Sequence, residues 1–234
     1  MIEVKGISVQ IAEKLILTSM NYQFEQGKIY GIIGPNGAGK STFLKVISGF
    51  LKPTTGQVYF MGKPLHSPDK NISVVWQKPY MFQTSVYQNV AYGLQVRHIN
   101  KYEIKNRVES ILQQFRIEHI ADQKAINLSG GETAKVAIAR AAILSPKVLI
   151  LDEPTASLDP QNVGEIEHIV QTYARKRRMT VIMVIHNMFQ AKRMADETIF
   201  LHSGHLIESN PTPLLFSQPS HELTKKFISG ETFF

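Results

Sequence analysis

A glycine-rich segment at residues 34–41 has the residue types and spacing of a phosphate-binding loop. It fits the pattern G-x-x-x-x-G-K-S/T without a mismatch. Glycines let the backbone turn tightly, so that successive N–H groups can point at phosphate oxygens. Lys40 supplies a positive charge for the terminal phosphates, and the Ser41 hydroxyl can ligate magnesium. We therefore expect a bound nucleotide to contact Gly34, Pro35, Asn36, Gly37, Ala38, Gly39, Lys40, Ser41 and the adjacent Thr42.

Two adjacent carboxylates follow a short apolar run at residues 148–151. Because neighbouring side chains on a strand point in different directions, Asp152 and Glu153 can have separate tasks. Beside a phosphate cradle, Asp152 would hold magnesium through water, and Glu153 would orient and deprotonate an attacking water molecule. Alone, such a pair is as often the start of a loop. Together with the cradle, it predicts hydrolysis of the nucleotide.

Apolar patterns on either side of these motifs predict the elements that position them. Two-residue alternation from Ile2 to Phe24 indicates strands, whereas the continuous apolar run at 29–33 indicates a parallel strand buried on both faces. A helix is expected from about Ser41, ending at Pro53. Two more buried strands, at 148–151 and 181–185 with a helix between them, imply a parallel sheet.

The segment 79–145 differs in character, because apolar residues recur there at helical spacing and no convincing strand is visible. Near the end of the chain, residues 203–204 predict a hairpin turn and residues 220–229 a polar helix. We therefore expect an α/β fold in a single domain, 1–234. Residues 1–78 and 146–234 would form a mixed β core with an antiparallel β subdomain, and residues 79–145 an inserted helical subdomain.

Four further motifs connect the sequence to a known family. Residues 128–132, Leu-Ser-Gly-Gly-Glu, resemble the signature sequence of the ABC ATPases. Gln77 is similarly placed to the Q-loop glutamine of that family, residues 157–159 resemble its D-loop, and His186 resembles its switch histidine. The motifs occur in the family's order and cover nearly the whole chain. The resemblance implies the ABC ATPase form of the P-loop NTPase fold, with a RecA-like core and a helical subdomain that carries the signature.

The resemblance also implies how the residues work. Two copies of the chain would hold two ATP molecules with Mg²⁺ between them, so that each signature faces the γ-phosphate bound by the other copy. Asp159 would communicate across this interface. The resemblance assigns catalysis to Glu153, His186 and Gln77, nucleotide contacts to Ile11, Ser129, Gly130, Gly131 and Asp159, and magnesium ligation to Ser41, Gln77 and Asp152.

Three departures from the family pattern stand out. Ile11 occupies the position where the family usually has an aromatic residue that stacks on adenine, so the contact there would be apolar only. Ala134 and Lys135 replace the usual Gln-Arg after the signature. Residues 49–50, Gly-Phe, end the first helix in an uncommon way to which the sequence alone assigns no meaning.

The segment 77–94 resembles the region of importer ATPases that receives a coupling helix of the membrane subunit. Tyr80, Met81 and Phe82 are expected to contact that permease, whereas Trp76, Val86 and Val90 are expected in the core. The sequence of this segment is similar to that of tungstate and molybdate importer ATPases and, next, to that of phosphate importer ATPases. Alternatives are a polar amino-acid importer and, from another class, a non-transport ABC ATPase or a nucleotide-sensing module.

Composition narrows the remaining possibilities. The 234 residues contain no cysteine, which excludes disulfides, and no apolar stretch approaches the roughly 18 residues of a membrane helix. The first residues lack the layout of a signal peptide. We therefore expect the protein to stay on the side of the membrane where it is made. The resemblance to importer ATPases then implies a peripheral protein at the cytoplasmic face of the cell membrane, served indirectly by an extracytoplasmic solute-binding protein. The formal charge is +7, but the basic run at 175–178 fits a helix end better than a nucleic-acid site.

Overall fold

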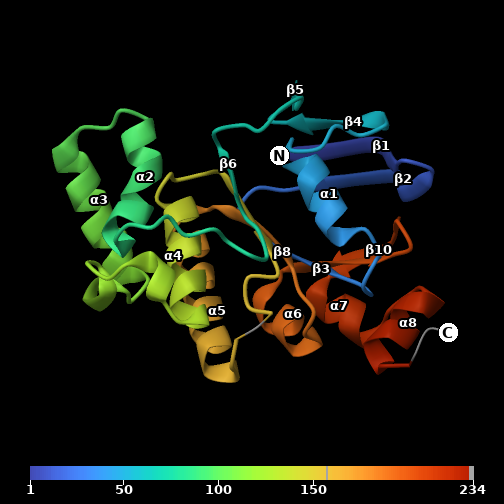
Figure 1. The fold of residues 1–234 in the computed structure, drawn as a ribbon. Helices are drawn as coiled ribbons and strands as arrows, with labels where there is room; N and C mark the ends of the chain where they lie inside the picture. The colour runs from blue at the N-terminus through green and yellow to red at the C-terminus, as the bar shows by residue number, and fades with distance from the viewer. Residues whose placement is uncertain (157, 232–234) are drawn as a thin grey trace. The chain divides into compact units, whose positions relative to one another are not determined.

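The structure, a computed structural model, describes residues 1–156 and 158–231. The chain divides into two compact units, Met1–Asp69 with Thr180–Phe234, and Lys70–Met179. The first unit is thus built from both ends of the chain and the second from its middle, as the colours in Figure 1 show. The helical subdomain expected at 79–145 stays a prediction. Among the described residues, no helix is both long enough and apolar enough to cross a bilayer.

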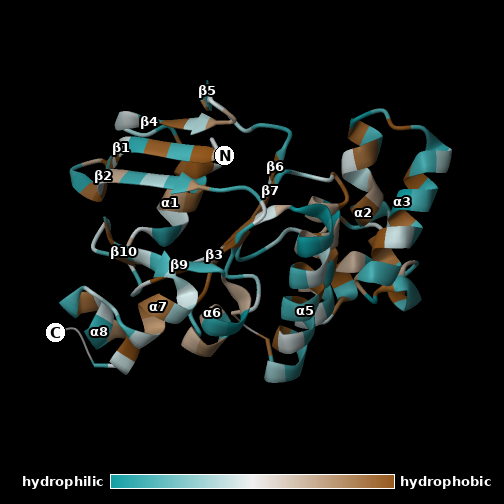
Figure 2. Cartoon of the chain, turned by 180° about the vertical axis from the view of Figure 1, so that it is seen from behind, coloured by the Kyte–Doolittle hydropathy of each residue, from teal (hydrophilic) through white to brown (hydrophobic). Residues whose placement is uncertain are grey.

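The first unit begins with an antiparallel sheet in the strand order β2-β1-β4-β5. Along β1, Ile2 and Val4 are buried, and then Ile7 and Val9, with a register shift at the left-handed Gly6 between the two pairs. The apolar alternation predicted from the sequence is therefore confirmed, with a bulge in its middle, and it is visible as bands in Figure 2. The strands are β1 Ile2–Ile11, β2 Lys14–Phe24, β4 Thr55–Phe60 and β5 Lys63–Pro64.

A mixed sheet in the order β10-β9-β3-β8 forms the core of the same unit. The central strand β3 is buried along its whole length and pairs in parallel with β8 and β9, as the continuous apolar run predicts. The strand β10 is antiparallel to β9 and follows the predicted turn at 203–204. The elements are β3 Ile29–Ile33, β8 Thr180–Val184, α6 Met188–Met194, β9 Glu197–His202, β10 His205–Pro211 and α7 Thr212–Ser217.

The first helix is shorter than predicted. The helix α1 spans Lys40–Ile47, whereas the sequence pattern placed its end at Pro53. It stops earlier because Gly49 adopts a left-handed conformation, with φ 80°, and Phe50 N donates to Lys45 O at 2.9 Å. This is a Schellman motif, which satisfies the last carbonyl groups of a helix. A Cβ atom at position 49 would lie 2.6 Å from the backbone of Ser67, so glycine is required at this helix end.

The second unit contains two parallel strands and a group of helices. The strands β6 and β7 pair in parallel, and α4 packs against α2, α5 and β6. The helix predicted from the spacing of apolar residues is α3, whose Ile104, Val108 and Ile111 are buried. No strand element occurs between β6 and β7, in agreement with the prediction for this described stretch. The elements are β6 Ile72–Val75, α2 Val86–Val96, α3 Lys101–Gln114, α4 Gly130–Ala142, β7 Val148–Asp152 and α5 Pro160–Arg177, with short 3-10 helices at Glu118–Ile120 and Ala125–Asn127.

A buried carboxylate in β10 anchors the last helix of the first unit, α8, which spans Glu222–Ser229. Glu208 accepts hydrogen bonds from Ser220 N at 2.9 Å, Ser220 Oγ at 2.8 Å and His221 N at 3.0 Å. Burial alone would raise the pKa of Glu208, but the hydrogen bonds from Ser220 and His221 outweigh it and lower the pKa to about 2. The predicted polar C-terminal helix is thus present and held by one ionised group.

Replacing Glu208 with glutamine is expected to lower the free energy of unfolding by about 2–3 kcal/mol at pH 7. The folded-state pKa of about 2 lies below the unfolded value, so the ionised group stabilises the fold above roughly pH 4.3. That contribution is lost as the pH falls towards 2, and the difference between wild type and variant should shrink with it. Urea unfolding at several pH values measures this. The exposed Glu222, changed to glutamine, is the matched control and should cause little loss.

Candidate active site

The glycine-rich loop connects β3 to α1 in the first unit. Its glycines at 34, 37 and 39 have φ of 149°, 79° and 95°, which disfavour any residue with a side chain. A Cβ atom at Gly34 would lie 2.1 Å from Leu201 O, and one at Gly39 would lie 2.7 Å from Leu17 Cδ2. Neighbouring strands therefore hold the loop closely, and its backbone N–H groups precede the positive end of a helix.

Lys40 is the first residue of α1 and is only 5% exposed. Its Nζ donates hydrogen bonds to Gly34 O and Pro35 O, each at 2.9 Å. The ammonium group is thus folded back over the loop that the glycines form. This geometry can bind a phosphate group, because a fixed cation and a turn of backbone lie together.

Two of the predicted catalytic residues are hydrogen-bonded to each other in the second unit. Gln77 Nε2 donates to Glu153 Oε2 at 2.7 Å, although the residues are 76 positions apart in the sequence. Glu153 directly follows β7 and has φ 50°, an uncommon left-handed conformation for a residue with a side chain. Asp152, the last residue of β7, is 6% exposed. A cavity of about 270 Å³ is lined by Gln77, Glu153 and Gly130, among others.

The signature residues form the beginning of α4. Ser129 is the N-cap, and it makes a capping box with Glu132: Ser129 N donates to Glu132 Oε2 at 2.9 Å, and Glu132 N donates to Ser129 Oγ at 3.4 Å. Hydrogen bonds from the Ser129 side chain and backbone lower the pKa of Glu132. The Ser-x-x-Glu spacing is the sequence signal of such a capping box.

Asp159, His186 and Ile11 each lie at or next to the end of a helix or strand. Asp159 is the N-cap of α5 and accepts from Gln161 N at 3.1 Å and from Asn162 N at 3.0 Å. His186 is exposed and follows β8. Ile11 ends β1 with 53% of its surface exposed. Ser157, which belongs to the predicted D-loop, lies outside the described residues.

The predicted residues divide between the two units. Ile11, Gly34, Pro35, Asn36, Gly37, Ala38, Gly39, Lys40, Ser41, Thr42 and His186 belong to the first unit. Gln77, Ser129, Gly130, Gly131, Asp152, Glu153 and Asp159 belong to the second.

The expected permease contact at 80–82 needs a correction. Tyr80 is 70% exposed, but Met81 is only 9% exposed and belongs to the core, so it offers no surface to a partner. The side-chain amide of Asn89 holds this segment, since its Oδ1 accepts from Phe82 N at 2.9 Å and its Nδ2 donates to Phe82 O at 3.1 Å. Val86 and Val90 are fully buried, as predicted, whereas Trp76 is half-buried.

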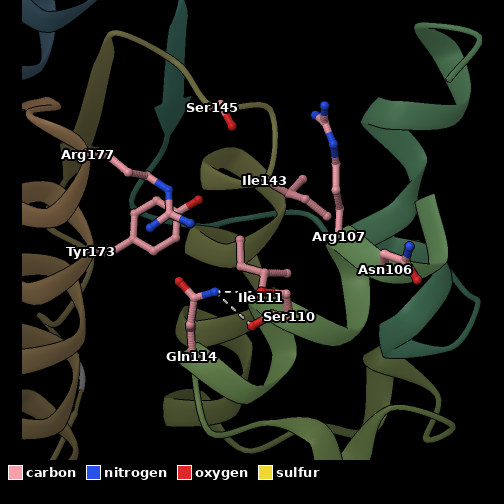
Figure 3. A pocket seen from close by; sticks show the side chains of 9 residues that line it. All are labelled: Asn106, Arg107, Ser110, Ile111, Gln114, Ile143, Ser145, Tyr173 and Arg177. Carbon is pink, nitrogen blue, oxygen red and sulfur yellow. Dashed lines mark hydrogen bonds between the residues drawn. The ribbon is translucent and has the colours of Figure 1, made fainter. Parts of the chain in front are cut away.

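A second concave region of the second unit, about 300 Å³ in volume, lies between α3 and the end of α5 (Figure 3). The Arg177 guanidinium packs over the Tyr173 ring, 3.7 Å from its centroid, and Gln114 Nε2 donates to Ser110 Oγ at 2.8 Å. The basic run at 175–178 lies at the end of α5, as predicted. Of the predicted site residues that the structure describes, none lines this region, so it is separate from the candidate active site.

The side chains predicted to hold magnesium, those of Ser41, Gln77 and Asp152, carry oxygen atoms of the kind that this ion binds. The described part of the chain contains no cluster of three or more His, Cys, Asp or Glu side chains placed to hold a metal on their own. Magnesium commonly takes one or two carboxylates and completes its octahedron with water and substrate phosphates. A buried aspartate at a strand end, together with hydroxyl and amide oxygens, is a donor set of that kind.

Comparison with known proteins identifies relatives that match most of the length of this chain. The sequence profile described as ABC transporter matches residues 17–156. The tungstate uptake system ATP-binding protein TupC of Peptoclostridium acidaminophilum is 40% identical over 209 residues, covering 89% of this chain and 98% of that protein. The phosphate import ATP-binding protein PstB 1 of Streptococcus pneumoniae is 38% identical, covering 98% and 97%.

The solved structures that are similar to this chain include a part of an ABC transporter complex and an ATP-binding cassette. The cbiO1 protein of Clostridium perfringens, part of the ABC transporter complex cbiONQ, superposes with a TM-score of 0.86 and 32% identity, covering 93% of this chain and 90% of that one. A dimeric post-hydrolysis state of the ATP-binding cassette MJ0796, bound to ADP and Pi, superposes with a TM-score of 0.81 and 26% identity, covering 91% and 99%.

Proposed function

This chain belongs to the ABC transporter family and is an ATPase, and from that premise we propose that it drives an importer of a small oxyanion, with tungstate or molybdate as the preferred solute. The observation that carries the proposal is the 40% identity to a tungstate uptake ATP-binding protein, which extends over 98% of that protein. Phosphate is the second candidate, because a phosphate import ATP-binding protein is 38% identical over 97% of its length.

In the proposed mechanism the chain's own residues position the phosphates and the attacking water. The N–H groups of the loop and Lys40 bind the β- and γ-phosphates of ATP. Glu153 accepts a proton from the water that attacks the γ-phosphate, and the hydrogen bond from Gln77 holds its carboxylate in a defined orientation. His186 contacts the γ-phosphate. A fixed base and fixed cations lower the barrier mainly by positioning and by stabilising charge.

Magnesium would be held by Ser41, Gln77 and Asp152, with Asp152 acting through water. When bound, the ion neutralises charge that builds up on the phosphate oxygens. The position of Asp152 at the carboxyl end of β7, directly before Glu153, supports this role.

The proposed working unit contains two copies of the chain and a membrane permease. The N-terminus of α4, capped by Ser129, offers N–H groups of Gly130 and Gly131 to the γ-phosphate bound by the partner copy. The dimeric structure of a relative with ADP and Pi supports this arrangement. Permease contact would involve Tyr80 and the half-buried Phe82, with the ATPase peripheral at the cytoplasmic face and a solute-binding protein on the other side.

The test is ATP hydrolysis by the complete complex, reconstituted with its permease and solute-binding protein. The panel contains tungstate, molybdate, phosphate, sulfate and polar amino acids, and a complex with Glu153→Gln is the blank. We expect a several-fold stimulation by tungstate or molybdate, with sulfate as the oxyanion control that leaves the rate unchanged. Stimulation by phosphate alone would replace the solute assignment, and a rate that no solute changes would contradict the importer proposal.

A further inference from the structure

The side chain of Asn162, in the first turn of α5, links Asp159 to the signature residues. Asn162 Nδ2 donates a hydrogen bond to Asp159 Oδ2 at 2.5 Å, while Asn162 N and Gln161 N donate to the other carboxylate oxygen, Oδ1. Both oxygens of Asp159 are therefore engaged, and the carboxylate has one orientation. The side-chain amide supplies the part of this arrangement that an ordinary helix cap does not contain.

The same amide lies directly against the beginning of α4. A Cβ atom at Gly131 would lie 2.5 Å from Asn162 Oδ1 and 2.7 Å from Asn162 Cγ. The neighbouring Gly130 makes a similar approach, since its Cβ would lie 3.2 Å from Leu158 Cδ2. The two signature glycines thus allow the segment 158–162 to pack closely, and a larger side chain at position 131 would displace the Asn162 amide.

A partly buried ion pair joins the same two helices further along. Lys135 in α4 is 8% exposed, and its Nζ lies 2.6 Å from Glu165 Oε2 in α5. Arg116 Nη1 lies 3.9 Å from the other oxygen of Glu165. Lys135 is one of the departures from the family pattern, and here it makes a short contact that fixes α4 against α5. Asn162 and Lys135 therefore hold one side of α4 at two levels, one turn apart.

We propose that Asn162 is a positioning residue that holds the Asp159 carboxylate and the signature glycines in one rigid element. The inference rests on the proposed ATP sandwich, in which Asp159 and the signature of one copy face the nucleotide of the other. Asn162 then acts through these two groups without touching ATP. Its loss leaves the phosphate loop of each copy intact, so ATP binding by a single copy is retained, but Asp159 and the N–H groups of α4 no longer reach the partner's site together.

The experiment measures ATP hydrolysis by the purified full chain and ATP-driven dimerisation in the Glu153→Gln background. The variants are Asn162→Ala, which removes the amide, and Asn162→Asp, which keeps its size but replaces the N–H donor with a second carboxylate. Gln161→Ala is the matched control, because the neighbouring residue contacts Asp159 only through its backbone N–H. Thermal unfolding of each variant is recorded with and without ATP.

We expect kcat to fall about tenfold to a hundredfold in both Asn162 variants, as for loss of a hydrogen bond to a charged group. The KM for ATP should stay within about twofold, the ATP-driven dimer should weaken, and Gln161→Ala should match the wild type. A wild-type kcat in Asn162→Asp, or a fall in kcat that only follows the unfolded fraction, would overturn the role of Asn162. If the chain with an unaltered Asn162 also fails to dimerise with ATP, the sandwich itself is contradicted, and the inference falls with it.

Discussion

A chain in which Glu153 is replaced by glutamine should bind ATP normally but hydrolyse it about 10²–10⁴-fold more slowly. Glutamine has the size and shape of glutamate and can still accept the hydrogen bond from Gln77, so the left-handed turn after β7 is preserved. What it lacks is a group that takes a proton from water at neutral pH. Phosphate release under saturating ATP and magnesium measures the change.

The same variant gives a second result, because ATP that is not hydrolysed should hold two copies together. Light scattering is expected to show a dimer with ATP and magnesium, and a monomer with ADP. The wild-type chain, which turns ATP over, is the control and should dimerise only transiently. A stable monomer of the variant under saturating ATP would count heavily against the sandwich, whereas undiminished phosphate release would remove Glu153 from the catalytic assignment.

Replacing Lys40 with alanine should raise the Kd for ATP roughly 30- to 1000-fold. The reason is that the phosphates then lack a buried cation, and removing one partner of such a charge pair costs about 2–4 kcal/mol. The ammonium group also bonds to Gly34 O and Pro35 O, so its loss frees the loop as well as removing the charge. Equilibrium binding of ATP to the purified chain gives the number directly.

Lys45→Ala is the matched control for this experiment. Lys45 lies on the same helix, in its last turn, and its side chain is exposed. The substitution removes an equal charge from the helix surface and should change the Kd for ATP by less than about twofold. Equal weakening in both variants would mean that net charge, and not the geometry of the loop, governs binding.

The parts of the fold that depend on local patterns could be predicted from the sequence. The apolar run of β3, the spacing in α3 and the residue types of the phosphate loop each encode their structure within a few positions. The end of α1 was predicted wrongly, because apolar spacing continues to Leu51 while Gly49 already reverses the backbone. A glycine at that position was the available signal.

Long-range contacts were beyond this kind of reasoning. The hydrogen bond between Gln77 and Glu153 joins residues 76 positions apart, and the sequence around neither residue predicts it. Met81 was expected to contact the permease because its segment resembles the partner-binding region of importer ATPases and is rich in Met and aromatic residues, yet the fold buries it. Asn162 was not singled out at all, since an asparagine in a first helical turn is ordinary until its contact with Gly131 is seen.

The division of the first unit between the two ends of the chain determines the order in which it can form during synthesis. The central strand β3 pairs with β8 and β9, whose first residues, Thr180 and Glu197, come about 150 positions later. At 5–20 residues per second, β3 is synthesised roughly 10–30 s before the two strands that pair with it. The newly synthesised chain therefore carries its phosphate loop next to a strand that still lacks both of its neighbours in the sheet.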